Sequence, residues 1–265
     1  MPRHGGIAPH QLRTTDGVRL DVCHQTAADG SRDLGIVLAH GFTGSWRGAP
    51  QSRIAALLAT SAGVVSFDFR GHGRSGGHST VGDREILDVA AAVAWARTLG
   101  YRQVATLGFS MGASVVIRHA GQLAGPDAVA AVSGPGRWYF RGTPPMRRVH
   151  WIVERPAGRL VSRLALGTRI SSGRWDPVPE QPTVAVARIS PTPLLIVHGD
   201  RDRYFPVGHA HALYEAARQP KELWIVPGFG HAESAADPTL VSRIAAWLRT
   251  AARGVDPGPA AAARQ

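Results

Sequence analysis

The sequence predicts an α/β domain with a mostly parallel β-sheet that is flanked by helices on both faces. Two patterns lead to this prediction. Apolar runs typical of strands buried on both faces recur at residues 34–41, 63–69, 103–109, 128–134, 193–199 and 222–228. Helical patterns separate them at residues 48–61, 83–99, 111–122, 206–218 and 237–252. Strands and helices that alternate in this way form a parallel sheet between two helical layers.

Local sequence signals support one of these helices and indicate an additional hairpin near the N-terminus. Residues 10–25 contain two short strand-like segments around Asp16-Gly17, and Asp-Gly is a strong signal for a hairpin turn. In the segment 83–99, apolar residues recur at helical spacing, and Gly100 follows as a C-terminal cap. We therefore expect an N-terminal hairpin in addition to the alternating strands and helices.

Cysteine content and hydropathy indicate the compartment. The chain has 265 residues and one cysteine, Cys23, so no disulfide can form within it. The first residues lack the apolar core of a signal peptide. No apolar run approaches the roughly 18 to 20 residues of a membrane span. These observations predict a cytoplasmic protein without an integral membrane span.

The positive charge indicates what kind of partner to expect. The formal net charge is +11, and Lys221 is the only lysine, so arginine supplies nearly all of the charge. Codon bias in a GC-rich genome explains this composition more simply than nucleic-acid binding. The chain has no basic run of five residues, no zinc-ligand spacing and no interleaved aromatic and basic residues. We expect a small-molecule substrate and no nucleic-acid partner; the oligomeric state stays open.

One segment interrupts the alternation of strands and helices. Residues 135–190 contain no clear strand, a helical pattern near 145–166 that Pro156 interrupts, and ten arginines against three acidic residues. A long insertion after one strand is most simply a cap or lid over a site. We predict a core of residues 1–134 and 191–253, a helical cap of residues 135–190 after the sixth strand, and a disordered tail of residues 254–265.

The segment GFSMG, residues 108–112, contains a candidate nucleophile. It places Ser110 between a predicted strand and a predicted helix. In that context the Gly-x-Ser-x-Gly pattern is typical of a nucleophile elbow, in which a sharp turn exposes the serine hydroxyl. The pattern alone also fits an ordinary strand-to-helix turn. A serine nucleophile needs a base as well, and the base needs an acid that orients it.

Candidates for the base and the acid follow the last two predicted strands. His231 lies in PGFGHAES, and it shares an edge with Ser110 because parallel strands end at one edge of the sheet. The segment HGDRDRYFP offers Asp200 and Asp202. We favour Asp202. Asp200 directly follows the strand and is placed to form the turn, whereas Asp202 lies further out, toward the next loop.

Two backbone N–H groups are candidates for an oxyanion hole. Met111 begins the helix after the elbow, where N–H groups lack intrahelical acceptors. Phe42 lies in AHGFTGS at the end of the first long parallel strand, and His40-Gly41 allows the chain to turn tightly there. A simple strand-end turn also explains this segment. The consistent order of all these strand-end segments favours the catalytic interpretation.

These segments together resemble the α/β-hydrolase superfamily over about residues 10–250. The matching segments are HGFTGS, FDFRGHGRSGG, GFSMG, HGDRDRYFP and GFGH. The chain is most similar to serine esterases, monoacylglycerol lipases and serine-aminopeptidase-like members. The resemblance implies an eight-stranded sheet with its second strand antiparallel. It also implies a triad of Ser110, Asp202 and His231, with Phe42 and Met111 as oxyanion donors.

Other polar residues near the predicted site have a structural interpretation. The segment FDFRGHGRSGG contains Arg70, His72 and Arg74, and in the family this loop is mainly structural. A structural or solvated role is also expected for three histidines outside this loop, which are His198, His209 and His211. We predict neither a metal site nor an organic cofactor.

The sequence thus predicts a cofactor-free serine hydrolase that cleaves a carboxylic ester through an acyl-enzyme. Trp138 and Trp151 of the cap are candidates for binding a partly hydrophobic acyl or aryl group. The arginines of the cap leave open a thioesterase or acyltransferase that uses the same triad on an anionic carrier. An aminopeptidase is disfavoured because the cap has few acidic residues. A non-catalytic binding protein is disfavoured because all three triad residues are present.

Overall fold

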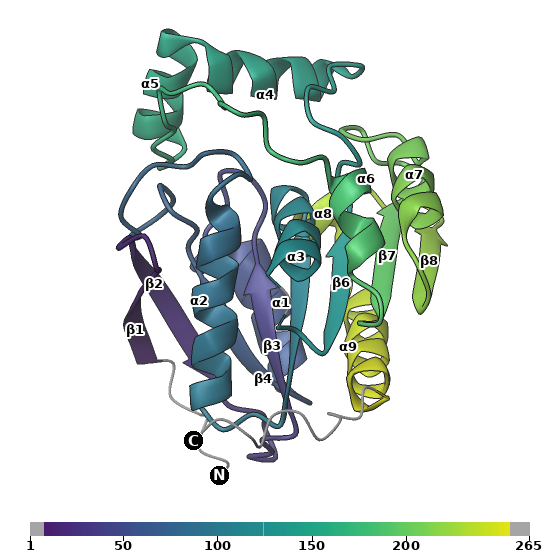
Figure 1. Ribbon diagram of the computed structural model, residues 1–265. Helices are drawn as coiled ribbons and strands as arrows, with labels where there is room; N and C mark the ends of the chain where they lie inside the picture. Colours follow the sequence, from purple (N-terminus) through teal and green to yellow (C-terminus); the bar gives the residue numbers. More distant parts are fainter. Residues whose placement is uncertain (1–7, 124, 255–265) are drawn as a thin grey trace.

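Eight strands form a single sheet in the order β1-β2-β4-β3-β5-β6-β7-β8 (Figure 1). The computed structural model describes residues 8–123 and 125–254. The strands are β1 (Ala8–Arg13), β2 (Arg19–Gln25), β3 (Leu34–Ala39), β4 (Gly63–Phe67), β5 (Gln103–Phe109), β6 (Ala128–Val132), β7 (Leu194–Gly199) and β8 (Lys221–Val226).

The strand directions confirm the predicted fold class. Strand β2 is antiparallel to both β1 and β4, and every other neighbouring pair is parallel. Strands β3 and β5 to β7 are buried over all or nearly all of their length, as expected for a sheet covered on both faces. The sheet is therefore eight-stranded and mostly parallel, with its second strand antiparallel.

Helices cover both faces of this sheet. One layer contains α1 (Ala49–Ala59), which packs against α9 (Pro238–Arg253) and the short α8 (Ala232–Ala235). The other layer contains α2 (Glu85–Thr98), α3 (Met111–Gln122), α6 (Pro182–Ala185) and α7 (Gly208–Ala216). A hydrophobic cluster fills the space between each layer and the sheet. The parallel strands end at the upper edge in Figure 1.

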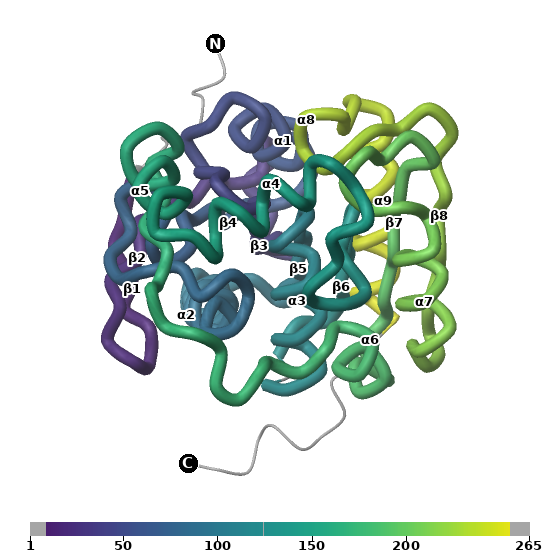
Figure 2. Tube along the Cα trace, turned by 90° about the horizontal axis from the view of Figure 1, so that it is seen from above, coloured from purple at the N-terminus to yellow at the C-terminus, as the bar shows by residue number. Residues whose placement is uncertain are grey.

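Two helices between β6 and β7 lie above that edge (Figures 1 and 2). They are α4 (Pro144–Glu154) and α5 (Pro156–Ala165). Arg155 between them is extended, because a residue that precedes proline is disfavoured in the helical region. After α5 the chain returns along the loop that follows β4, through single β-bridges from Thr168 to His72 and from Ile170 to Ser79.

Most predicted elements are present, with ends that differ by about one to three residues. The predicted strand 34–41 ends at Ala39, and the predicted strand 63–69 ends at Phe67, because the next residues leave the sheet and enter loops. The predicted disordered tail lies, except for Gly254, outside the described residues. No helix in the described part of the chain is both long enough and apolar enough to cross a membrane.

Buried histidines in this core give a testable dependence of stability on pH. His119 of α3 is almost fully buried, and burial lowers its pKa from 6.5 to about 4. The unfolded chain therefore binds a proton that the folded chain excludes. The free energy of unfolding should fall as the pH decreases through this window, by up to about 3 kcal/mol for one such group.

Denaturant titrations at a series of pH values would measure this effect. His119→Leu should reduce the slope of the free energy of unfolding between pH 6.5 and about 4, the two pKa values of this histidine. A residual slope should remain, because burial also lowers the pKa of His72 to about 3 and that of His209 to about 4. An unchanged slope in the variant would show that His119 does not contribute.

Candidate active site

Ser110 occupies a sharp turn between β5 and α3. Its backbone has φ 51° and ψ −114°, a conformation that non-glycine residues rarely adopt. The Ser110 N–H donates to the carbonyl of Val132 at 2.9 Å, which ties the turn to the end of β6. Strain of this kind is held in place by the surrounding structure and is common at functional sites.

Both glycines of GFSMG are required by close backbone contacts. A Cβ atom on Gly108 would lie 2.3 Å from the carbonyl oxygen of Gly112. A Cβ atom on Gly112 would lie 2.5 Å from the carbonyl oxygen of Ala39. No side chain fits at either position, so the glycines allow α3 to begin directly against the ends of β5 and β3.

Ser110, His231 and Asp202 form a continuous chain of hydrogen bonds. The His231 Nε2 atom lies 2.9 Å from Ser110 Oγ, and its Nδ1 atom lies 2.8 Å from Asp202 Oδ2. A carboxylate only accepts, so Nδ1 carries the proton and Nε2 accepts from the serine hydroxyl. Ser110 directly follows β5, and Asp202 and His231 lie in the loops after β7 and β8. The structure thus brings these three predicted residues together.

The surroundings of Asp202 favour its ionised form. Burial alone would raise the pKa of Asp202. The hydrogen bond and the charge of His231, together with hydrogen bonds from the Phe205 and Tyr204 N–H groups, outweigh burial and lower the pKa. These two N–H groups donate to Oδ1 at 3.1 and 2.7 Å, so the carboxylate is held on both oxygens. Asp200 has a different partner, since its Oδ1 accepts from the Gly228 N–H at 2.7 Å.

Phe42 and Met111 lie beside Ser110 along the same cavity. Met111 is the first residue of α3, so its N–H has no acceptor within the helix. The loop that contains Phe42 is held by two buried histidines. His40 accepts from the Phe69 N–H at 3.1 Å, and His72 accepts from the Thr43 N–H at 3.3 Å. Burial lowers the pKa of both histidines, so they stay neutral and keep these acceptor nitrogens.

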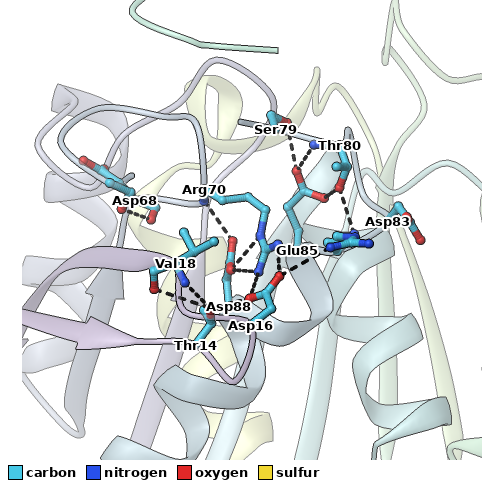
Figure 3. A network of polar contacts seen from close by, with 12 residues as sticks. Thr14, Asp16, Val18, Asp68, Arg70, Ser79, Thr80, Asp83, Glu85 and Asp88 are labelled. Atoms are coloured by element: carbon cyan, nitrogen blue, oxygen red, sulfur yellow. Dashed lines mark hydrogen bonds and ion pairs between the residues drawn. The ribbon is translucent and has the colours of Figure 1, made fainter. Parts of the chain in front are cut away.

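Arg70 belongs to a buried structural network. Figure 3 shows its guanidinium group between Asp16 and Asp88, with which it forms ion pairs at 2.7 and 2.8 Å. Burial disfavours the charged guanidinium, but the hydrogen bonds that it donates to these two carboxylates, and their negative charge, outweigh this effect and raise the pKa of Arg70. The network ties the loop after β4 to the N-terminal hairpin and to α2. Arg70 has no contact with Ser110, His231 or Asp202 among the described interactions.

A cavity of about 1210 Å³ lies between the sheet edge and the cap. Ser110, Met111 and Phe42 line it from the core, and Trp138, Val149 and Val153 line it from the cap. The Trp138 indole N–H donates to the carbonyl of Pro179 at 3.0 Å, which fixes the ring against the wall.

Trp151 differs from the expectation that it binds substrate. It does not line the cavity, and it is 48% exposed on the outer side of α4. The helical repeat explains this difference. Val149 and Val153 are one turn apart and face the cavity, whereas Trp151, halfway between them, lies on the opposite face.

Tyr204 contacts the site but was not expected from the sequence. Its ring stacks on the His231 ring with centroids 4.2 Å apart and an angle of 24°. The stacking limits rotation of the imidazole. In the sequence, the only indication of a role for Tyr204 was its position two residues after Asp202. That position does not reveal a contact with the loop that contains His231.

Glu233 is a second contact that the sequence did not indicate. The Gly41 N–H donates to its Oε1 atom at 2.5 Å, so the carboxylate joins the loop that contains Phe42 to the helix after His231. A Cβ atom on Gly41 would lie 3.2 Å from Ser110 Cβ and 3.3 Å from both carboxylate oxygens. Gly41 therefore lies against both the serine side chain and the carboxylate, and a side chain at this position would crowd both.

Comparisons with known proteins agree with this fold. The alpha/beta hydrolase family matches residues 36–244. A monoacylglycerol lipase of Mycolicibacterium smegmatis is 26% identical to the chain, over 84% of the chain and 89% of the lipase. An esterase of Pyrococcus furiosus has a similar structure, with a TM-score of 0.73, 25% identity and 93% coverage of both chains. An alpha/beta hydrolase of Penicillium has a TM-score of 0.74 at 20% identity, with coverage of 94% and 99%, and supports the fold alone.

The fold and the family match define a hydrolase. The chain belongs to the alpha/beta hydrolase family, whose match covers most of its length.

The contact between Glu233 and Gly41 leads to a prediction about ester hydrolysis. Glu233→Ala removes the acceptor of the Gly41 N–H and loosens the loop that contains Phe42. If the Phe42 N–H acts mainly in the transition state, kcat should fall by about 10- to 100-fold with little change in KM. Hydrolysis of a p-nitrophenyl ester measures both constants.

Glu233→Gln is the matched control, because its amide oxygen can still accept from Gly41. It should retain kcat within about threefold of the original chain, since the neutral hydrogen bond remains. Equal losses in both variants would indicate that the charge of Glu233, rather than its support of the loop, is what the reaction requires.

Proposed function

We propose that this hydrolase is a serine esterase that acts through an acyl-enzyme, with Ser110, His231 and Asp202 as its catalytic triad. The observation that carries the proposal is the unbroken hydrogen-bond chain of 2.9 and 2.8 Å from Ser110 to Asp202. The lowered pKa of Asp202 supports it, because an ionised carboxylate stabilises the imidazolium that forms during the reaction.

The proposed reaction has two steps. In the first, Ser110 Oγ bonds to the acyl carbon while its proton moves to His231 Nε2, and the leaving alcohol then takes that proton. In the second, His231 takes a proton from water while the water oxygen bonds to the acyl carbon, the bond from that carbon to Ser110 Oγ then breaks, and His231 returns the proton to Ser110 as the acid is released. In both steps the N–H groups of Phe42 and Met111 donate to the oxyanion. The reaction requires neither a metal nor an organic cofactor.

The cavity above Ser110 supports a substrate with a substantial apolar part. It has a volume of about 1210 Å³, above the range of roughly 300 to 1000 Å³ that is usual for small ligands. Trp138, Val149 and Val153 supply apolar walls from the cap. These features favour an acyl or aryl ester over a small, fully polar substrate.

A second candidate is a thioesterase or acyltransferase that uses the same triad on an anionic carrier. Four cavity-lining arginines of the cap favour it, since none has a carboxylate within 4.0 Å among the described residues. These arginines are Arg137, Arg155, Arg159 and Arg174. Their charge would attract a phosphate or carboxylate group on the part of the substrate that leaves.

Labelling with a fluorophosphonate probe tests the nucleophile directly. The original chain should be labelled, and Ser110→Ala should not be. The variant should also lose at least about 10³-fold in kcat/KM on p-nitrophenyl esters. A labelled or fully active variant would contradict the proposal.

A substrate panel separates the two candidates. Esters and thioesters with the same acyl group are compared, each with a neutral and with a phosphate-bearing leaving group. Preference for neutral esters supports the esterase. Preference for the anionic thioesters, weakened by salt, supports the second candidate.

The different partners of two neighbouring aspartates give a further prediction. Asp202→Asn leaves a neutral amide beside His231 and should lower kcat by about 10³- to 10⁴-fold through loss of the correct tautomer. Asp200→Asn should have an effect of less than about tenfold, because Asp200 contacts only the turn at Gly228. Steady-state kinetics of both variants tests the assignment, and the reverse order of effects would refute it.

A further inference from the structure

The outer surface of the cap exposes an unusual concentration of apolar side chains. The described part of the chain has nine exposed large hydrophobic residues. Five of them lie in the sixteen-residue segment 151–166, which covers the end of α4, all of α5 and the residue that follows α5. We call these five the cap patch, which consists of Trp151, Leu160, Val161, Leu164 and Leu166. Solvent-exposed apolar residues are common singly, but such a cluster marks an interaction site.

Helix α5 has its apolar side turned toward solvent. Leu160 and Leu164, one turn apart, are 56% and 75% exposed. The buried positions of the same helix are Gly158 and Ser162. A Cβ atom on Gly158 would lie 2.4 Å from the carbonyl oxygen of Trp151, so α5 packs closely on the backbone of α4 through its small residues. An amphipathic helix normally buries its apolar side, and here nothing in the described chain covers it.

The helix α4 completes this surface. An open groove of about 470 Å³ lies along the outer side of α4, and its lining includes Trp151 and Ile152 of α4 and Val161 of α5. Because the other side of α4 faces the cavity, the cap patch and the cavity lie on opposite sides of the same helix. A partner that covered the patch would not occupy the space above Ser110.

The charges around the cap patch indicate which partner fits. Residues 144–166 contain one acidic residue, Glu154, and it is already paired with Arg141 and His150. Exposed arginines flank the apolar side chains, and none has a carboxylate within 4.0 Å among the described residues. They are Arg147, Arg148 and Arg163.

We propose that the cap patch docks on the surface of an anionic lipid bilayer. Leucine, valine and tryptophan side chains would enter the boundary between headgroups and acyl chains, and the arginines would contact lipid phosphates. A second copy of this chain fits less well, because two such patches would bring unpaired arginines face to face. Nucleic acid would satisfy the arginines but would leave the aliphatic side chains exposed. The inference does not depend on the proposed catalytic triad.

Sedimentation with vesicles tests the proposal. The full chain is mixed with vesicles of phosphatidylcholine alone, or of phosphatidylcholine and phosphatidylglycerol in equal amounts. It should bind the anionic vesicles, and binding should weaken with added salt. Absence of binding, or equal binding to both vesicles, would overturn the proposal.

Variants show whether the cap patch is responsible. Leu160→Ser/Leu164→Ser should lower the partition coefficient by about tenfold or more, because two apolar side chains no longer enter the bilayer. Arg147→Ser/Arg148→Ser should lower it by a similar factor. The controls, Leu123→Ser and Arg102→Ser/Arg218→Ser, replace exposed residues outside the patch and should bind as the original chain does. Undiminished binding by the patch variants would overturn the assignment.

A fluorescent label reports insertion independently of sedimentation. The single native cysteine, Cys23, is buried, so an added cysteine is the accessible labelling site. An environment-sensitive dye on Leu164→Cys should shift to the blue with anionic vesicles, and the same dye on Leu123→Cys should not. Light scattering and oligonucleotide titration test the other occupants. The proposal would be overturned if the original chain did not bind vesicles but formed a dimer or an oligonucleotide complex that Leu160→Ser/Leu164→Ser abolishes.

Discussion

The close approach of α3 to the end of β3 is the contact on which the site depends. Gly112 lies so near the Ala39 carbonyl that a Cβ atom would be 2.5 Å from it. This approach places the first N–H groups of α3 beside the loop that contains Phe42, with Ser110 at their junction. A larger residue at position 112 would separate two elements that are far apart in sequence and would open the site.

Much of this site could be predicted from the sequence because topology does most of the positioning. Ser110, Asp202 and His231 each follow a strand whose apolar run is easy to recognise, and parallel strands end at one edge. The number of strands and the antiparallel β2 came from resemblance to a family rather than from periodicity. The structure confirms both.

The contacts that the sequence did not reveal are tertiary. Glu233 accepts from Gly41, which is 192 positions away, and no local pattern encodes that pairing. Tyr204 stacks on His231 because two loops converge in space. Trp151 was expected near the substrate because the sequence places it in the cap segment but does not show which face of its helix points toward the site. The side of α4 that faces the cavity depends on how the cap packs over the sheet edge. In this arrangement Trp151 lies on the opposite side of α4, away from the cavity.

The place where the cap enters the sheet has a consequence for how such a domain can change. Strands β6 and β7 are neighbours that pair along their length, and the cap occupies the connection between them. The entropic cost of closing a connection grows slowly, by about 0.6 kcal/mol for each doubling of its length. The core can therefore accept a longer, shorter or differently charged connection without losing the pairing that positions Ser110. Substrate preference and surface attachment can vary in this one segment while the catalytic framework stays constant.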